Sequence, residues 1–235
     1  MARNLQTELN MIAQILQKRR LCKDTTPITN AIQKNNKGDS CFNIENLEII
    51  LPVPGNIIPS CIKHLVAIIT VKSDNIQAHE TDIVHMFNNY YFNIQFVGNR
   101  PEEENRYYSS IHLDYEASAA SNYIHPWFHL TYGGHGVKHI DNGRLMVLPT
   151  PRIPIWPMDF ILGLDFVLSN FLNKEDYNRW FIDDSNYKSS LKNSQYNIWR
   201  PYFLAIAHHW CKFSNCKHNM IHPELSRNYM PTLIL

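Results

Sequence analysis

The sequence predicts an α+β fold: a small antiparallel meander sheet packed with an N-terminal helix and a central apolar helix, plus a C-terminal helical extension. Apolar residues recur at helical spacing in residues 3–21, segments between 62 and 132 have the patterns of strands, and residues 157–172 are apolar almost all round. We expect an α+β core domain over 1–172, with a linker and the helical extension, packed on that core, over 173–235.

The composition supports one globular protein without a membrane segment. The 235 residues are 44% hydrophobic and 18% charged, and a net charge of +1 gives no bulk attraction to nucleic acid or anionic membranes. The five cysteines are an odd number, the N-terminus lacks the apolar core of a secretory signal, and no apolar run approaches the ~20 residues of a membrane span. We therefore expect a cytoplasmic location with free thiols.

The first half of the chain alternates between helical and strand patterns. The amphipathic stripe predicts a helix over about 3–21, and the polar, breaker-rich residues 23–42 predict a loop with one helical turn at most. Residues 46–55 predict a short strand stopped by its prolines. Residues 62–71 are β-branched and almost continuously apolar, which predicts a central strand covered on both faces.

The next segments predict the rest of the sheet. Residues 75–89 are ambiguous, although their apolar positions allow a helix. Phe92, Ile94 and Phe96 alternate with polar residues, so a third strand begins near Tyr90. Short polar loops connect the consecutive strands, which predicts an antiparallel meander.

The second half is expected to be mainly helical. Prolines stiffen the approach to an apolar helix, and Pro157 suits its first turn. The Asn- and Ser-rich residues 173–194 predict a linker. A final helix over about 196–213 accommodates Pro201 only near its first turn or at a kink.

Polar side chains gather on one face of the two strands predicted within residues 111–132. Alternation sends one set to a polar face and leaves the other face apolar. The polar set is His112, Asp114, Glu116, His125, Trp127 and His129, and the apolar set is Ile111, Leu113, Tyr115, Phe128, Leu130 and Tyr132.

The polar face is the candidate catalytic site. His125 and His129 would lie ~13 Å apart on an extended strand, too far to share one ion unless the backbone bends. A pairing of His125 with Glu116, or of His129 with Asp114 or His112, would hold a divalent metal or serve as general acid and base in phosphodiester cleavage. The alternative is a solvated or packed face, with Trp127 as filler and each histidine hydrogen-bonded.

Three further positions are candidates for binding. Gly133 and Gly134 allow a backbone nest for an anion, and the alternative is a flexible turn. Arg152 is a candidate binding residue, and the alternative is a structural clamp onto Asp159 or Asp165.

The C-terminal residues include a candidate metal site. His208, Cys211, Cys216 and His218 are zinc ligand types, but the C-x4-C-x-H pattern departs from the usual spacing of paired ligands. A helix end without metal is the alternative.

The middle of the chain resembles an uncharacterised family of bacterial proteins from phage-defence islands, some encoded beside a helicase. In that family a D-Y dipeptide precedes an H-P-x-x-H-L-T-x-G motif, R-I-P and an apolar helix. The matching residues lie within 111–172 and are Asp114-Tyr115, His125-Pro126, His129-Leu130-Thr131, Gly133, Arg152-Ile153-Pro154 and Phe160-Ile161-Leu162. The stretch between Gly133 and Arg152 is longer here than in the family pattern.

The resemblance implies a defence component and supplies no activity. We expect an accessory or sensor subunit that contacts a larger partner from the same operon, an ATPase or a nucleic-acid enzyme, and that meets nucleic acid through this partner. Aromatic residues of the strand region suit such an interface; they are Tyr90, Tyr91, Tyr107, Tyr108 and Trp127. The competing expectation is a metal-dependent nuclease effector that uses the polar sheet face.

Overall fold

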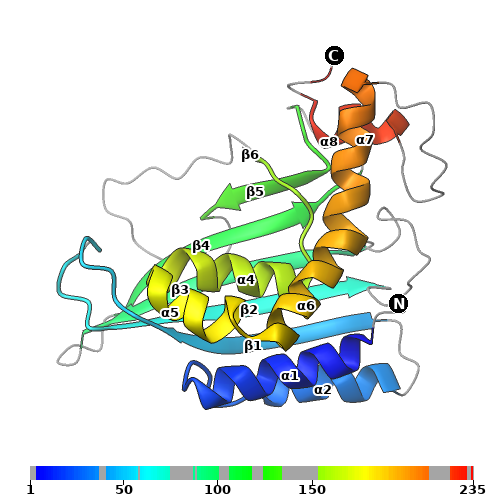
Figure 1. Cartoon of the computed structure of the whole chain (residues 1–235). Helices are drawn as coiled ribbons and strands as arrows, with labels where there is room; N and C mark the ends of the chain where they lie inside the picture. Colours follow the sequence, from blue (N-terminus) through cyan, green and yellow to red (C-terminus); the bar gives the residue numbers. More distant parts are fainter. Residues whose placement is uncertain are drawn as a thin grey trace.

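The computed structural model describes residues 4–36, 41–57, 59–74, 87, 89–100, 106–117, 124–133, 153–211, 223–231 and 234. These residues form a six-stranded sheet in which each strand pairs antiparallel with the next along the chain (Figure 1). The predicted α+β class and the meander are confirmed. The strands are β1 (Cys41–Leu51), β2 (His64–Asp74), β3 (Tyr91–Asn99), β4 (Arg106–Tyr115), β5 (Phe128–Tyr132) and β6 (Ile153–Pro154).

The inner face of the sheet packs against the apolar helix α4 (Phe160–Phe171). Alternate side chains of β1 to β5 are buried on this face, among them Ile49, Ile69, Phe92, Leu113 and Phe128. Helix and sheet approach closely, because a Cβ atom at Gly163 would lie 2.1 Å from the ring of Phe92. The helix begins three residues later than predicted, because the Asp159 carboxylate caps it by accepting from the Leu162 N–H at 2.9 Å.

The outer face of the sheet is less covered than the sequence suggested. On β2 the inward residues are buried, whereas Val66, Ile68 and Thr70 on the outer face are only half-buried. The prediction of a strand fully covered on both sides is therefore wrong. The reason is visible in Figure 1, where α4, α5 and α6 all lie on one side of the sheet.

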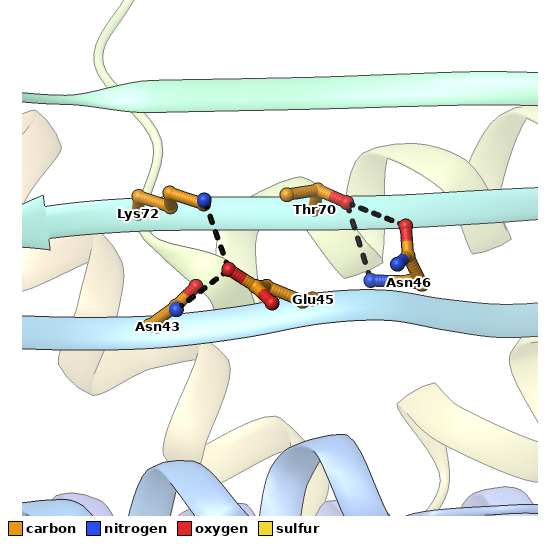
Figure 2. Close-up of polar contacts among 5 residues, drawn as sticks. All are labelled: Asn43, Glu45, Asn46, Thr70 and Lys72. Atoms are coloured by element: carbon orange, nitrogen blue, oxygen red, sulfur yellow. Dashed lines mark hydrogen bonds and ion pairs between the residues drawn. The ribbon is translucent and has the colours of Figure 1, made fainter.

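A bulge in β1 keeps its apolar residues on the inner face. The register against β2 shifts between Ile44 and Leu47, and Asn46 adopts a φ of 54° in the left-handed region. The Asn46 N–H donates to Thr70 Oγ1 at 3.2 Å, and the Thr70 hydroxyl donates to Asn46 Oδ1 at 3.4 Å (Figure 2). Because of the extra residue, the apolar side chains of β1 point to the inner face both before and after the shift. β1 also begins earlier than the predicted strand.

Two helices lie along β1 at the edge of the sheet (Figure 1). α1 (Leu5–Lys18) confirms the predicted N-terminal helix. The prediction of a loop over 23–42 is wrong, because α2 (Thr26–Asn36) occupies much of it. The side chains of Ile28 and Ala31 are buried, so α2 has an apolar face that its many polar residues concealed.

The predicted linker over 173–194 is also wrong, because this stretch is helical. α5 (Lys174–Tyr177) and α6 (Ser185–Ser194) are joined by the π-helical turn η2 (Asn178–Ile182), and η3 (Gln195–Trp199) leads into α7 (Arg200–Cys211). Side chains cap these helices: Asn173 accepts from Asp176 N–H at 2.8 Å, and Asp184 accepts from Tyr187 N–H at 3.0 Å. Pro201 lies in the first turn of α7, as expected.

The C-terminal residues 223–230 pack against both α7 and the segment that enters β5. η4 (Pro223–Leu225) and α8 (Ser226–Tyr229) lie beside α7 (Figure 1). The ring of Tyr229 is buried, 4.9 Å from the ring of Tyr202 and 5.7 Å from that of Phe128. The Trp127 N–H donates to the Asn228 carbonyl at 2.9 Å, so α8 is fixed to the entry of β5.

Candidate functional site

The polar outer face of β4 and β5 brings an aspartate between two histidines. Asp114 lies directly opposite His129 in the strand register, and His112 precedes it by two residues on the same face. Asp114 Oδ2 lies 3.2 Å from His112 Nε2 and 3.7 Å from His129 Nε2. The predicted pairing of His129 with Asp114 is confirmed. We call His112, Asp114 and His129 the polar cluster.

The chain bends at Trp127, directly before β5 begins. Both imidazoles of the H-P-x-x-H motif place Nδ1 3.1 Å from the Pro126 carbonyl oxygen, and the rings of His125 and His129 meet edge to face with centroids 4.4 Å apart. The ~13 Å separation expected for an extended strand is therefore wrong. It is wrong because β5 starts only at Phe128, so His125 and His129 are not on one continuous strand.

The cluster is partly enclosed. The side chain of His129 is 3% exposed, whereas those of His112 and Asp114 are 19% and 31% exposed. Burial, followed by the negative charge of Asp114, raises the pKa of Tyr91, which faces Asp114 from β3. The side chains of His112 and Asp114 are therefore partly open to solvent, whereas that of His129 is buried.

Two predicted members of the polar face lie at or beyond the ends of β4 and β5. Trp127 precedes β5, and its ring packs edge to face on Tyr115 at 5.9 Å and on Tyr229 at 6.1 Å, so it belongs to the aromatic packing. Glu116 follows the last residue of β4, its N–H donates to the Trp127 carbonyl at 2.9 Å, and its side chain is exposed. The regular alternation ends where the strand ends, which is why the assignment of Trp127 to the polar face was wrong.

The candidate anion nest is only partly described. Gly133 has a φ of 87°, and its N–H donates to the Ser110 carbonyl at 2.7 Å at the end of β5. That bond uses the amide that a nest would direct at an anion, so Gly133 makes a strand-closing turn. Gly134 and Arg152 lie outside the described residues.

The two aspartates considered as partners of Arg152 both make contacts within the fold. Asp159 caps α4 and also accepts from the Ser194 hydroxyl at 2.8 Å. Asp165 accepts from the hydroxyls of Tyr177 at 2.8 Å and Tyr187 at 2.9 Å. Burial raises the pKa of Asp165, and the two tyrosine hydrogen bonds oppose that shift.

The candidate C-terminal metal site falls half outside the described residues. His208 and Cys211 lie on the last turn of α7, and Cys211 is exposed with a free thiol. Cys216 and His218 are not among the described residues. Within the ranges that the structure describes, no three His, Cys, Asp or Glu side chains are arranged to hold a metal ion, and this includes the polar cluster.

The exposed aromatic residues differ from those expected. Tyr90 is buried and donates its hydroxyl to the Met158 carbonyl at 2.6 Å, while Tyr107, Tyr108 and Trp127 are half-buried. Tyr91 is exposed, as predicted. The other strongly exposed aromatic side chains of the described chain were not singled out by the sequence; they are Tyr132, Trp156, Tyr196, Phe203 and Trp210.

Comparisons with known proteins give no match: no family model, no curated protein and no solved structure is significantly similar to this chain. In the described ranges, no helix has both the length and the apolar character needed to cross a membrane.

Proposed function

We propose that this protein is an accessory or sensor subunit of a bacterial antiviral defence system. It acts in the cytoplasm by contact with a larger protein partner from the same operon, an ATPase or a nucleic-acid enzyme. The resemblance of residues 111–172 to the phage-defence-island family supports the defence assignment.

The position of the family motif is consistent with a scaffolding role. Pro126 is buried in the turn that leads into β5, His129 is buried within β5 itself, and Phe160, Ile161 and Leu162 form the buried start of α4. These buried motif residues therefore belong to the packing between sheet and helix, although the same stretch also carries the exposed rings of Tyr132 and Trp156.

The observation that carries the contact part of the proposal is the group of exposed aromatic rings on η3 and α7. Tyr196, Phe203 and Trp210 are 59%, 44% and 66% exposed. Large aromatic side chains are enriched in protein interfaces and frequently supply most of the binding energy. A subunit that works by contact requires such a surface.

Co-expression with the neighbouring genes tests this proposal. The affinity-tagged chain should retain one neighbouring gene product through size-exclusion chromatography. Deletion of the gene that encodes this chain should remove protection against phage in plaque assays. A chain that retains none of these products, in a locus that protects equally well without it, would overturn the proposal.

A nuclease effector is the second candidate, and the polar cluster is the observation that favours it. A carboxylate between two imidazoles is a suitable arrangement for general acid–base catalysis. RNA and DNA cleavage by the wild type, His112→Ala and His64→Ala, with and without Mg²⁺, Mn²⁺ or Zn²⁺, decides it. Cleavage lost only in His112→Ala would favour the effector, and no cleavage in any metal would eliminate it.

A further inference from the structure

A cleft of about 620 Å³ lies over the outer face of β1 and β2, on other strands than the polar cluster. Ile50 and Val66, which pair across the two strands, form its apolar base, and Pro27 in the first turn of α2 lines one side. The Ile50 N–H donates to the Leu21 carbonyl at 2.7 Å, so the segment between α1 and α2 is fixed along the outer edge of β1 (Figure 1). Small-ligand sites have volumes of roughly 300–1,000 Å³, so this space, which we call the β1 cleft, has the size of a ligand site.

Two charged side chains that line the β1 cleft are unpaired in the part of the chain that the structure describes. Glu48 on β1 and Lys63, directly before β2, are both exposed, and neither side chain makes a hydrogen bond or ion pair there. Lys23 and Asp24 line the cleft as well, but they are adjacent and opposite in charge, and Asp24 Oδ1 accepts from the Thr26 N–H at 2.9 Å. The uncompensated charges of the cleft are therefore one carboxylate and one ammonium group.

The strand register separates these two charges along the β1 cleft. Glu48 pairs with Ile68, and Lys63 lies five residues before Ile68 in the sequence. Five residues of a strand rise ~16 Å, and the two side chains can extend over the space between them, which leaves ~10 Å between the charged groups. An extended peptide of about three or four residues has this length, because each residue spans ~3.4 Å. A single amino acid is too short to reach both charges.

We propose that the β1 cleft binds a short linear peptide with free termini, whose ammonium group pairs with Glu48 and whose carboxylate pairs with Lys63. Apolar side chains in the middle of the peptide lie on Ile50 and Val66, which are half-buried in the structure and lose further contact with water when the peptide binds. An ammonium group only donates hydrogen bonds and a carboxylate only accepts them, so the two ends of the cleft select one orientation of the peptide. This site goes beyond the proposed contact with a larger partner and does not depend on it.

Other classes of ligand match the charges of the β1 cleft less well. A nucleotide has negative phosphates and no cationic group to pair with Glu48, and the described lining residues include no Phe, Tyr or Trp on which its base could stack. A fatty acid could lie on the apolar base, but it would also leave Glu48 without a partner. A peptide with both termini free pairs both charges.

The tetrapeptide Ala-Val-Leu-Ala with free termini provides the probe, titrated into the full chain by calorimetry at low ionic strength, where screening is weak. Acetylation of its N-terminus and amidation of its C-terminus should each weaken binding about fivefold, the size expected when one solvent-exposed ion pair is lost. Tetraglycine with free termini should bind at least about tenfold more weakly, because it has no side chain to bury on Ile50 and Val66.

Matched variants assign each end of the peptide to its partner. In Glu48→Gln, acetylation should no longer weaken binding while amidation still does, and Lys63→Gln should give the reverse. Glu45→Gln and Lys72→Gln are the controls, because these two exposed side chains lie on the same strands, pair with each other at 2.9 Å and do not line the β1 cleft. Both controls should retain the full effect of each cap, with circular dichroism verifying the fold of all four variants.

Several results would overturn the inference: no binding of the tetrapeptide at millimolar concentration, equal affinity for its free and capped forms, or cap effects that persist unchanged in Glu48→Gln and Lys63→Gln. The comparison of free and capped peptides on the wild type depends on no variant. Tighter binding of GMP than of the tetrapeptide, lost in Lys63→Gln, would assign the β1 cleft to a nucleotide instead.

Discussion

At the scale of single residues, two carboxylates have pKa values that folding shifts in opposite directions. Burial raises the pKa of Asp165, although the hydroxyls of Tyr177 and Tyr187 donate to it. The pKa of Glu45 is lowered, first by the hydrogen bond from Asn43 and then by Lys72, whose Nζ lies 2.9 Å from Glu45 Oε1 (Figure 2). The two groups therefore give opposite contributions to the pH dependence of stability.

The effect of Asp165→Asn on the free energy of unfolding should become more favourable as pH rises. Folding favours the protonated form of Asp165, so its contribution to stability is complete below the unfolded pKa and is lost as pH rises through the native pKa. Asn cannot ionise and can accept both tyrosine hydrogen bonds. Urea unfolding between about pH 3 and 7 should show the variant gaining stability relative to the wild type. A difference that is constant or falls with pH would contradict this.

Glu45→Gln should give the opposite trend. The native pKa of Glu45 is lowered, so its contribution is present above the unfolded pKa and is lost as pH falls through the native pKa. In the same unfolding series this variant should lose stability relative to the wild type as pH rises. The effect is small because Glu45 is exposed and solvent screens the pair.

His129→Ala should destabilise the protein. The ring is buried, contacts His125 and lies within hydrogen-bond distance of the Pro126 carbonyl. Its removal leaves a cavity and loses that hydrogen bond, which together should lower the free energy of unfolding by about 2–4 kcal/mol. His64→Ala, at an exposed position, should change the free energy of unfolding by less than about 0.5 kcal/mol. Equal effects of the two substitutions in denaturant titrations would show that His129 does not support the fold.

At the scale of elements, the packing of α4 on the sheet depends on a residue without a side chain. A methyl group at Gly163 would lie 2.1 Å from the Phe92 ring, and neither element can move away cheaply because both are in the core. Gly163→Ala should therefore lower the free energy of unfolding by about 1–3 kcal/mol, despite the better helix propensity of Ala. Gly55→Ala, with nothing within 4 Å of the added atom, is the matched control. A stabilised Gly163→Ala protein would contradict the close approach of helix and sheet.

The elements predicted correctly are those with an uninterrupted apolar pattern. The alternation of Phe92, Ile94 and Phe96 identified β3, and the nearly all-apolar residues of α4 identified a buried helix. α2 and α6 were not predicted because most of their residues are polar, and the few apolar residues on one face give too weak a periodic pattern. Their start signals were present: Asp24 and Pro27 before and in the first turn of α2, and Asp184 before α6.

At the scale of the whole molecule, contacts formed only in the folded chain determine how the residues of the candidate site lie relative to one another, which the sequence did not predict. The alternation assigned His112, Asp114 and His129 to one face, but only the strand register places Asp114 opposite His129. The bend at Trp127 brings the ring of His125 against that of His129, and no periodic pattern contains that information. Trp127 was misplaced for the same reason, since its neighbour Tyr229 is far away in the sequence.

The proposed contact with a larger protein partner concerns the whole molecule. It is tested most directly by measuring the mass of the purified complex with light scattering, after co-expression with each product of the neighbouring genes. We predict a stable species well above the 27.6 kDa of the single chain, containing one neighbouring product. A 27.6 kDa monomer in the presence of every one of these products would contradict the account.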